Sequence, residues 1–136
     1  MDVVVIGCGA AKLNEPAKAK DLYTGQLFKL NLEYAEKFYP NTARFIFSAK
    51  YGFVETDEVL EPYNTRIGKP GSLTKPEIKM SAIHKGIIGA RVILLAGRDY
   101  QKALRDCFAE FEVPFEGLQI GYRLQALNKA LKEVQG

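Results

Sequence analysis

The chain has 136 residues, of which 47% are hydrophobic and 26% are charged, and its formal net charge at pH 7 is +3. This length and apolar content fit a single domain over residues 1–136 with a core of its own, and leave little room for a second. No apolar stretch approaches the roughly 20 residues that a membrane-spanning helix needs, so no membrane association is expected.

The N-terminal residues and the cysteine content favour a cytoplasmic protein. No basic lead-in precedes the apolar run that ends at Gly7, so no signal peptide is expected. Two cysteines without a secretory context indicate free thiols in a reducing compartment. The mildly basic charge permits a nucleic-acid or phosphorylated partner without requiring one.

Apolar runs and helical spacing alternate along the chain. In chain order they predict a strand at 3–6, a loop at 8–21, a helix at about 24–38, a strand at 44–47, a long loop at 48–72, a helix at 74–88, a strand at 91–96, a helix at 100–111, a weaker strand around 115–120 and a helix at 122–134. Thr74 and Glu77 match a capping box, Gly89 is expected to end that helix, and Asp99 is expected to cap the next.

Strands that alternate with helices predict parallel pairing with right-handed crossovers. We therefore expect an α/β fold, a single three-layer domain whose mainly parallel sheet has about four strands. The loop at 48–72 is long for a compact domain, and loops of this kind are usually functional.

The carboxyl ends of parallel strands lie along one edge of a sheet, where ligands bind in open α/β folds. Glycine-containing loops follow the four predicted strands, at 7–9, 48–52, 97–100 and 121–123. Glycine lets backbone approach a ligand closely, and helix N-termini at this edge favour anions. The sequence therefore predicts a site for a phosphate and a planar ring at the carboxyl edge.

Several side chains in these loops are candidate substrate-binding groups. Aromatic rings can stack on a base for about 1–3 kcal/mol, and cations can neutralise phosphates. The candidates are Lys12, Tyr23, Ser48, Lys50, Tyr51, Tyr63 and Arg98. The alternatives are that the tyrosines pack the long loop onto the sheet and that the lysines are ordinary solvated surface residues.

Cys8, Asp21 and Glu61 are the candidate catalytic residues. A thiolate beside a positively polarised loop is a nucleophile, although a cysteine at a strand end is also a common buried small residue. A carboxylate near an aromatic wall can act as a general base, or it can be a solvated turn residue. One histidine, His84, and two separated cysteines give no metal-ligand cluster, so neither a metal nor another cofactor is expected.

Four features of the sequence belong together: Cys8 with Lys12, the segment 21–28 (Asp-Leu-Tyr-Thr-Gly-Gln-Leu-Phe), the segment 48–52 (Ser-Ala-Lys-Tyr-Gly) and the segment 61–63 (Glu-Pro-Tyr). In combination they resemble a family of small proteins of bacteria, archaea and phages that is known only as a domain of unknown function. The resemblance covers nearly the whole chain. Ala96-Gly97 with Tyr100 also fits its pattern.

Two remoter similarities accompany this resemblance. The segment 48–52 with Pro62-Tyr63 is similar to one in the peroxide-stress protein YaaA, which binds DNA, and the region of Cys8, Lys12 and Tyr23 is similar to a motif of archaeosine synthase, which acts on a deazaguanine base in tRNA. This chain differs from that motif by a long insertion after Lys12 and by Phe28 in place of a histidine. Jointly the similarities imply a nucleic-acid or modified-base context.

Three hypotheses follow. The first is an enzyme that processes a nucleobase or nucleic acid, by glycosidic-bond or modified-base chemistry, with Tyr51 and Tyr63 sandwiching the base and Asp21 or Glu61 managing protons. The second is a non-catalytic DNA- or RNA-binding module related to stress response. The third is a small-molecule enzyme that uses Cys8.

Overall fold

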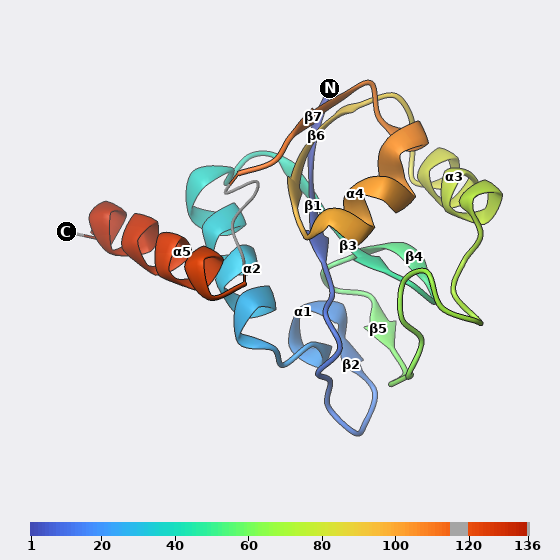
Figure 1. Cartoon of the computed structure of the whole chain (residues 1–136), viewed down its shortest axis with the longest axis horizontal. Coiled ribbons are helices and arrows are strands. Elements are labelled where there is room, and N and C mark those ends of the chain that lie inside the picture. The colour runs from blue at the N-terminus through green and yellow to red at the C-terminus, as the bar shows by residue number, and fades with distance from the viewer. Residues whose placement is uncertain (115–119, 136) are drawn as a thin grey trace.

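A five-stranded, mainly parallel sheet forms the centre of the computed structural model, which describes residues 1–114 and 120–135. Its strands, in spatial order, are β4 (Gly52–Glu55), β3 (Ala43–Ser48), β1 (Asp2–Gly7), β6 (Arg91–Leu95) and β7 (Glu110–Glu112). All neighbours pair in parallel except the edge strand β4, which runs antiparallel to β3. The predicted three-layer α/β fold is confirmed (Figure 1).

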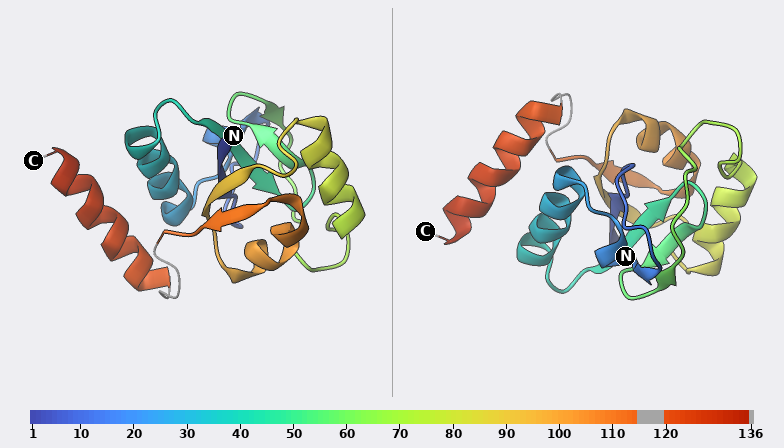
Figure 2. Two further views of the ribbon diagram at one scale, coloured as in Figure 1. Left: turned by 90° about the horizontal axis from the view of Figure 1, so that it is seen from above. Right: turned by 90° about the horizontal axis from the view of Figure 1, so that it is seen from below.

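Helices cover both faces of this sheet (Figures 1 and 2). One face carries α1 (Ala19–Leu22) and α2 (Gln26–Phe38), and α5 (Ile120–Gln135) packs on α2; the other carries α3 (Lys75–His84), α4 (Arg98–Leu104) and the short 3₁₀ helix η1 (Arg105–Cys107). Because side chains alternate along a strand, Val3 and Val5 pack into the core under α3, whereas Val4, Ile6 and Cys8 pack on the α2 side. Both faces are buried, which explains the unbroken apolar run of β1.

Residues that follow β1 and β6 line a crevice at the carboxyl ends of these strands. These two strands are neighbours in the sheet. The chain leaves β1 towards α2 on one face and leaves β6 towards α4 on the opposite face (Figure 2). Such a point, where neighbouring loops diverge, is where open α/β sheets bind ligands. Cys8 follows β1, so the fold places its thiol at this crevice.

The segment predicted as a long loop at 48–72 contains two strands. The chain makes a tight hairpin through Ala49, Lys50 and Tyr51 and returns as β4, with Gly52 at φ +79°. A three-residue turn followed by a left-handed glycine is a common hairpin form, so Ser-Ala-Lys-Tyr-Gly carried this signal. Farther on, β5 (Val59–Leu60) pairs antiparallel with β2 (Ala17–Lys18), beyond the carboxyl edge of the main sheet.

Two predicted helices are shorter than expected. Thr74 and Glu77 form the predicted capping box of α3, but this helix ends at His84, before Gly89, and the chain turns first at Gly86 with φ +73°. The helix predicted at 100–111 ends at Leu104, because the chain turns to pair β7 with β6. Asp99 makes no side-chain cap, and Gly97 occupies the cap position.

The fourth parallel strand also differs from the prediction. Residues 110–112 form β7. The strand was expected around 115–120, and residues 115–119 lie outside the described part of the chain. Ile120 is the first residue of α5. None of the described helices combines the length and apolar character needed to cross a membrane.

Gly52 is expected to be intolerant of any side chain. A Cβ placed there would lie 2.5 Å from the Ser81 Oγ, which accepts the Phe53 N–H at 3.0 Å. Together with the left-handed backbone, Gly52→Ala should lower the free energy of unfolding by about 2–3 kcal/mol. The control Gly86→Ala has a similar φ but no atom within 4 Å, so urea unfolding should show a loss of only about 1 kcal/mol. Equal losses would contradict the contact with Ser81.

Candidate functional site

The Cys8 thiol is the centre of a hydrogen-bonded cluster at the carboxyl edge. Its sulfur lies 3.5 Å from the Tyr100 hydroxyl and 3.7 Å from the Tyr63 hydroxyl, distances suited to the large radius of sulfur. Cys8 follows β1, Tyr100 lies in α4 and Tyr63 lies between β5 and α3. The thiol group therefore joins three segments that are remote in sequence, and Cys8 is only 4% exposed.

The directions of the hydrogen bonds follow from counting protons. The Ser48 Oγ accepts the backbone N–H groups of Lys50 and Tyr51 at 3.1 and 3.0 Å, so its single hydroxyl proton is free to donate to the Tyr63 hydroxyl at 2.7 Å. The proton of Tyr63 in turn points to the Cys8 sulfur. This hairpin turn thus excludes Ser48 as an acceptor for the Tyr63 hydroxyl, whose proton is directed at the Cys8 sulfur.

Tyr23 is a buried member of the same hydrogen-bonded cluster. Its hydroxyl lies 2.5 Å from that of Tyr63, and since the Tyr63 proton is directed at sulfur, Tyr23 is the donor of this bond. Tyr23 has no exposed surface, and its ring meets the Tyr63 ring edge-on. It is therefore a supporting residue of the cluster rather than a surface that a ligand can reach.

Tyr100 completes the cluster from the opposite side. Its hydroxyl accepts the Gly9 N–H at 3.3 Å, which leaves its proton for the Cys8 sulfur. Gly7 makes this approach possible, because a Cβ there would lie 2.9 Å from the Ala96 Cβ and 3.2 Å from the Tyr100 ring. The sulfur consequently accepts two O–H donors, an arrangement that stabilises a thiolate.

The electrostatics keep these hydroxyls protonated. Burial raises the pKa of Tyr23, Tyr63 and Tyr100 above the ordinary tyrosine value, and the negative charge of an ionised Cys8 raises it further. The Tyr63 and Tyr100 hydroxyls are thus proton donors to sulfur throughout the physiological range.

Lys12 brings a cation to the edge of the cluster. Its Nζ lies 4.6 Å from the centre of the Tyr63 ring and donates to the Ala10 carbonyl at 2.7 Å. Burial lowers the pKa of Lys12 and the charge of Arg66 lowers it further, although Cys8 acts in the opposite direction. Lys12 therefore gives up a proton more readily than a solvated lysine does.

Tyr51 and Tyr63 do not form the expected base sandwich. Their ring centres are 5.4 Å apart and the ring planes meet at 87°, whereas a base can be sandwiched only between parallel rings. The Tyr51 hydroxyl donates to the Glu61 backbone carbonyl, and the Lys50 Nζ lies 5.3 Å from the Tyr51 ring. Tyr51 thus packs against the Tyr63 ring, and the Lys50 Nζ lies against the Tyr51 ring.

Three predicted site residues lie outside the cluster. The side chains of Asp21, Glu61 and Arg98 are exposed, and none of them bonds to a member of the cluster or lines the hollow beside Cys8. His84 is also exposed, at the end of α3. The structure brings together Cys8, Lys12, Tyr23, Ser48, Tyr51 and Tyr63.

A hollow of about 330 Å³ opens beside Cys8. It is lined by Cys8, Gly9, Ala10, Ala49, Thr65, Arg66, Ile67, Lys69, Asp99 and Tyr100. Arg66 and Lys69 were not among the predicted site residues; their position in the long loop near Tyr63 was the available signal. No group of three or more potential metal-ligating side chains occurs in the described part of the chain.

Tyr63→Phe should destabilise the protein because it removes the acceptor of two buried hydroxyl groups, those of Ser48 and Tyr23. We expect urea unfolding to show a loss of about 1–3 kcal/mol. Tyr51→Phe is the matched control, since it removes one longer bond of 3.3 Å near the surface, and should cost about 0.5 kcal/mol. Similar losses in the two variants would show that the buried hydrogen bonds of Tyr63 contribute no more to the free energy of unfolding than the surface hydrogen bond of Tyr51.

Comparison with known proteins places the chain among proteins without an assigned activity. It is 29% identical over 143 residues to the uncharacterized protein YfjM of Bacillus subtilis (strain 168), an alignment that covers 95% of this chain and 94% of that protein. No solved structure matches it. The family of unknown function DUF6884 matches residues 3–129, which include Cys8, Ser48, Tyr63 and Tyr100. The chain therefore belongs to this family, as the resemblance of its motifs indicated.

Proposed function

We propose that the protein is an enzyme that processes a nucleobase, either in a nucleotide or in a nucleic acid, and that Cys8 is its nucleophile. The observation that carries the proposal is the convergence of two hydroxyl donors, Tyr63 and Tyr100, on one cysteine sulfur beside an open hollow. A cysteine that is merely buried needs no donors. Oriented donors instead favour a thiolate, which is the reactive form.

The nucleobase class is supported by two further features. Arg66 and Lys69 line the hollow beside Cys8 and suit a phosphorylated substrate. The remoter similarities of the motifs to archaeosine synthase and YaaA imply a nucleic-acid or modified-base context. Since the carboxylates of Asp21 and Glu61 lie outside the cluster, covalent chemistry at Cys8 fits the geometry better than base catalysis by a carboxylate.

The proposed step is addition of the Cys8 thiolate to an electron-poor ring carbon of the base. A carbon–sulfur bond forms, and the displaced electron pair moves to a ring nitrogen or oxygen, which takes a proton. Lys12 is suited to give this proton because burial lowers its pKa. In the adduct the ring is no longer aromatic, so water can replace an exocyclic amino group, which leaves as ammonia. Elimination then breaks the carbon–sulfur bond, returns its electron pair to Cys8 and returns the ring proton to Lys12. Tyr63 and Tyr100 stabilise the thiolate before addition and after elimination.

The test incubates the protein with nucleosides, nucleoside monophosphates and single-stranded oligonucleotides. Chromatography with mass detection reads changed or released bases, and acid quenching followed by intact-protein mass reads covalent adducts. We expect a changed base and an adduct on the peptide that contains Cys8. If no member of the three substrate classes gives a product or an adduct, the nucleobase proposal is wrong.

A non-catalytic DNA- or RNA-binding module is the second candidate. The observation that favours it is the set of cations around the Cys8 hollow that form no ion pair among the described residues. The same incubation, with the equilibrium binding of the oligonucleotides measured alongside, separates the two. Binding without any product or adduct supports the module, whereas an adduct at Cys8 supports the enzyme.

A further inference from the structure

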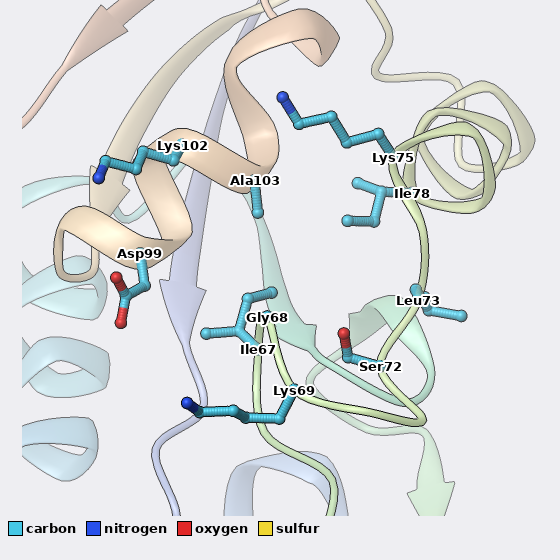
Figure 3. Close-up of a pocket in the computed structure, with 10 residues that line it drawn as sticks. All are labelled: Ile67, Gly68, Lys69, Ser72, Leu73, Lys75, Ile78, Asp99, Lys102 and Ala103. Atoms are coloured by element: carbon cyan, nitrogen blue, oxygen red, sulfur yellow. The ribbon is translucent and has the colours of Figure 1, made fainter.

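A second hollow continues from the one beside Cys8. It has a volume of about 400 Å³ and is lined by Ile67, Gly68, Lys69, Ser72, Leu73, Lys75, Ile78, Asp99, Lys102 and Ala103 (Figure 3). Ile67, Lys69 and Asp99 line both hollows, so the two are contiguous. The walls come from the loop that precedes α3, from the first turns of α3 and from α4 (Figure 3).

Cationic side chains outnumber anionic ones on these walls. Four of them, Arg66, Lys69, Lys75 and Lys102, line the two hollows, against the single carboxylate of Asp99. Within the described part of the chain none of the four forms an ion pair, whereas Lys20, Lys37, Lys85 and Arg91 each pair with a carboxylate. Like charges that gather around a hollow without partners repel one another, and an anionic ligand removes this repulsion.

The loop that carries Arg66 and Lys69 is held in shape by its own backbone. The Lys69 N–H donates to the Arg66 carbonyl at 3.1 Å and the Ser72 N–H to the Lys69 carbonyl at 3.0 Å. The Leu73 N–H then joins the loop to the Ala49 carbonyl in the hairpin that also orients Tyr63. The cations are therefore attached to a defined frame connected to the Cys8 cluster, which reduces the cost of ordering them around a ligand.

We propose that the two hollows form one phosphate-binding channel that leads away from Cys8, and that the ligand carries more than one phosphate group. Arg66 and Lys69 hold the phosphate nearest to Cys8, and Lys75 and Lys102 hold the next. A nucleoside triphosphate and a single-stranded oligonucleotide both present this chemistry. The inference rests on the proposed function for its substrate class, but binding to the channel requires no reaction at Cys8.

The test measures the equilibrium binding of three probes to the full chain: a nucleoside monophosphate, a nucleoside triphosphate and a short single-stranded oligonucleotide. Lys69→Gln should weaken all three about fivefold at low salt, because Lys69 lines both hollows. Lys102→Gln should weaken the triphosphate or the oligonucleotide by a similar factor and leave the monophosphate unchanged. For the oligonucleotide, each variant should reduce the slope of log affinity against log salt by about 0.7.

Two further variants test whether the effect depends on the position and on the sign of the charge that is removed. Lys29→Gln removes the same charge from an exposed position on α2, which lies on the opposite face of the sheet from α3 and α4, and should change affinity little. Asp99→Asn keeps the shape of the side chain and removes the one carboxylate of the channel, so it should strengthen phosphate binding about fivefold. A sensitivity to Lys102→Gln confined to the oligonucleotide identifies nucleic acid, and one confined to the triphosphate identifies a nucleotide.

The channel is refuted if Lys69→Gln and Lys102→Gln affect binding no more than Lys29→Gln, or if Asp99→Asn fails to strengthen it. The outcome is independent of turnover. Loss of the channel with an intact Cys8 adduct would refute only this inference, and phosphate binding without any product or adduct would refute only the proposed function.

Discussion

Replacing Cys8 with serine should lower turnover on the proposed nucleobase substrate by at least about 10³-fold, because a hydroxyl is a far weaker nucleophile than a thiolate at neutral pH. The side chain keeps its size, so Tyr63 and Tyr100 should retain their positions. The measurement is the single-turnover rate of the wild type and the variant at saturating substrate, with circular dichroism to confirm that both are folded.

Cys107→Ser is the matched control for this prediction. Cys107 is 3% exposed, lies in η1 on the opposite side of the sheet, and packs in the core with Leu104 and Phe108. Its replacement should lower stability and leave the rate per folded molecule unchanged. Turnover that survives Cys8→Ser at more than about a tenth of the wild-type rate would exclude covalent catalysis by Cys8.

Stability should fall steeply above pH 10, by up to about 4 kcal/mol per pH unit from three tyrosines at about 1.4 kcal/mol each. Burial raises the pKa of Tyr23, Tyr63 and Tyr100 in the folded state, while the unfolded chain titrates near the ordinary value of 10. Their contribution is therefore complete below pH 10. Above it the unfolded state loses protons that the folded state keeps, so the contribution is lost as pH rises.

Urea unfolding at a series of alkaline pH values measures this slope. Tyr63→Phe should make it shallower by about 1.4 kcal/mol per pH unit. An identical slope in the wild type and in Tyr63→Phe would mean that the Tyr63 hydroxyl ionises as freely in the folded state as in the unfolded one.

The strand order could not be read from the sequence, although most elements could. Continuous apolar runs in β1, β3 and β6 indicated strands buried on both faces, and Thr74 with Glu77 marked the start of α3. β4 was missed because a four-residue strand that begins with glycine carries little periodicity. The helix predicted at 100–111 was too long because helical spacing continued to Phe111, while pairing of β7 with β6 ended the helix earlier.

The sequence predicted the edge of the sheet at which the candidate site lies, but not the hydrogen bonds that join its residues. Parallel pairing was enough to bring the loops after β1 and β3 together, and so to suggest Cys8, Ser48 and Tyr63. Which hydroxyl donates to which atom depends on the Ser48 turn and on the contact between Gly7 and Tyr100, and neither follows from spacing. Asp21 and Glu61 were suggested by the same loops, but their side chains are exposed and lie outside the cluster, because a loop position does not say where a side chain points.

The structure also gives a physical reason for the Ser-Ala-Lys-Tyr-Gly motif. Ser48 receives two backbone N–H groups of its own turn and passes its proton to Tyr63, while Gly52 supplies the left-handed backbone that returns the chain as β4. The motif therefore serves folding and the candidate site at once. Ser48→Ala would leave the Lys50 and Tyr51 N–H groups without this acceptor and Tyr63 without this donor.

The reactivity of Cys8 relative to Cys107 towards iodoacetamide tests the central claim most directly. The two thiols are almost equally buried, at 4% and 3% exposure, but only Cys8 lines the hollow that holds Arg66, Lys69 and Tyr100. Burial raises the pKa of Cys107, which keeps it protonated. Peptide mapping over time at neutral pH should show Cys8 alkylated at least about tenfold faster than Cys107. Equal rates, or a slower Cys8, would contradict the assignment of Cys8 as a nucleophile.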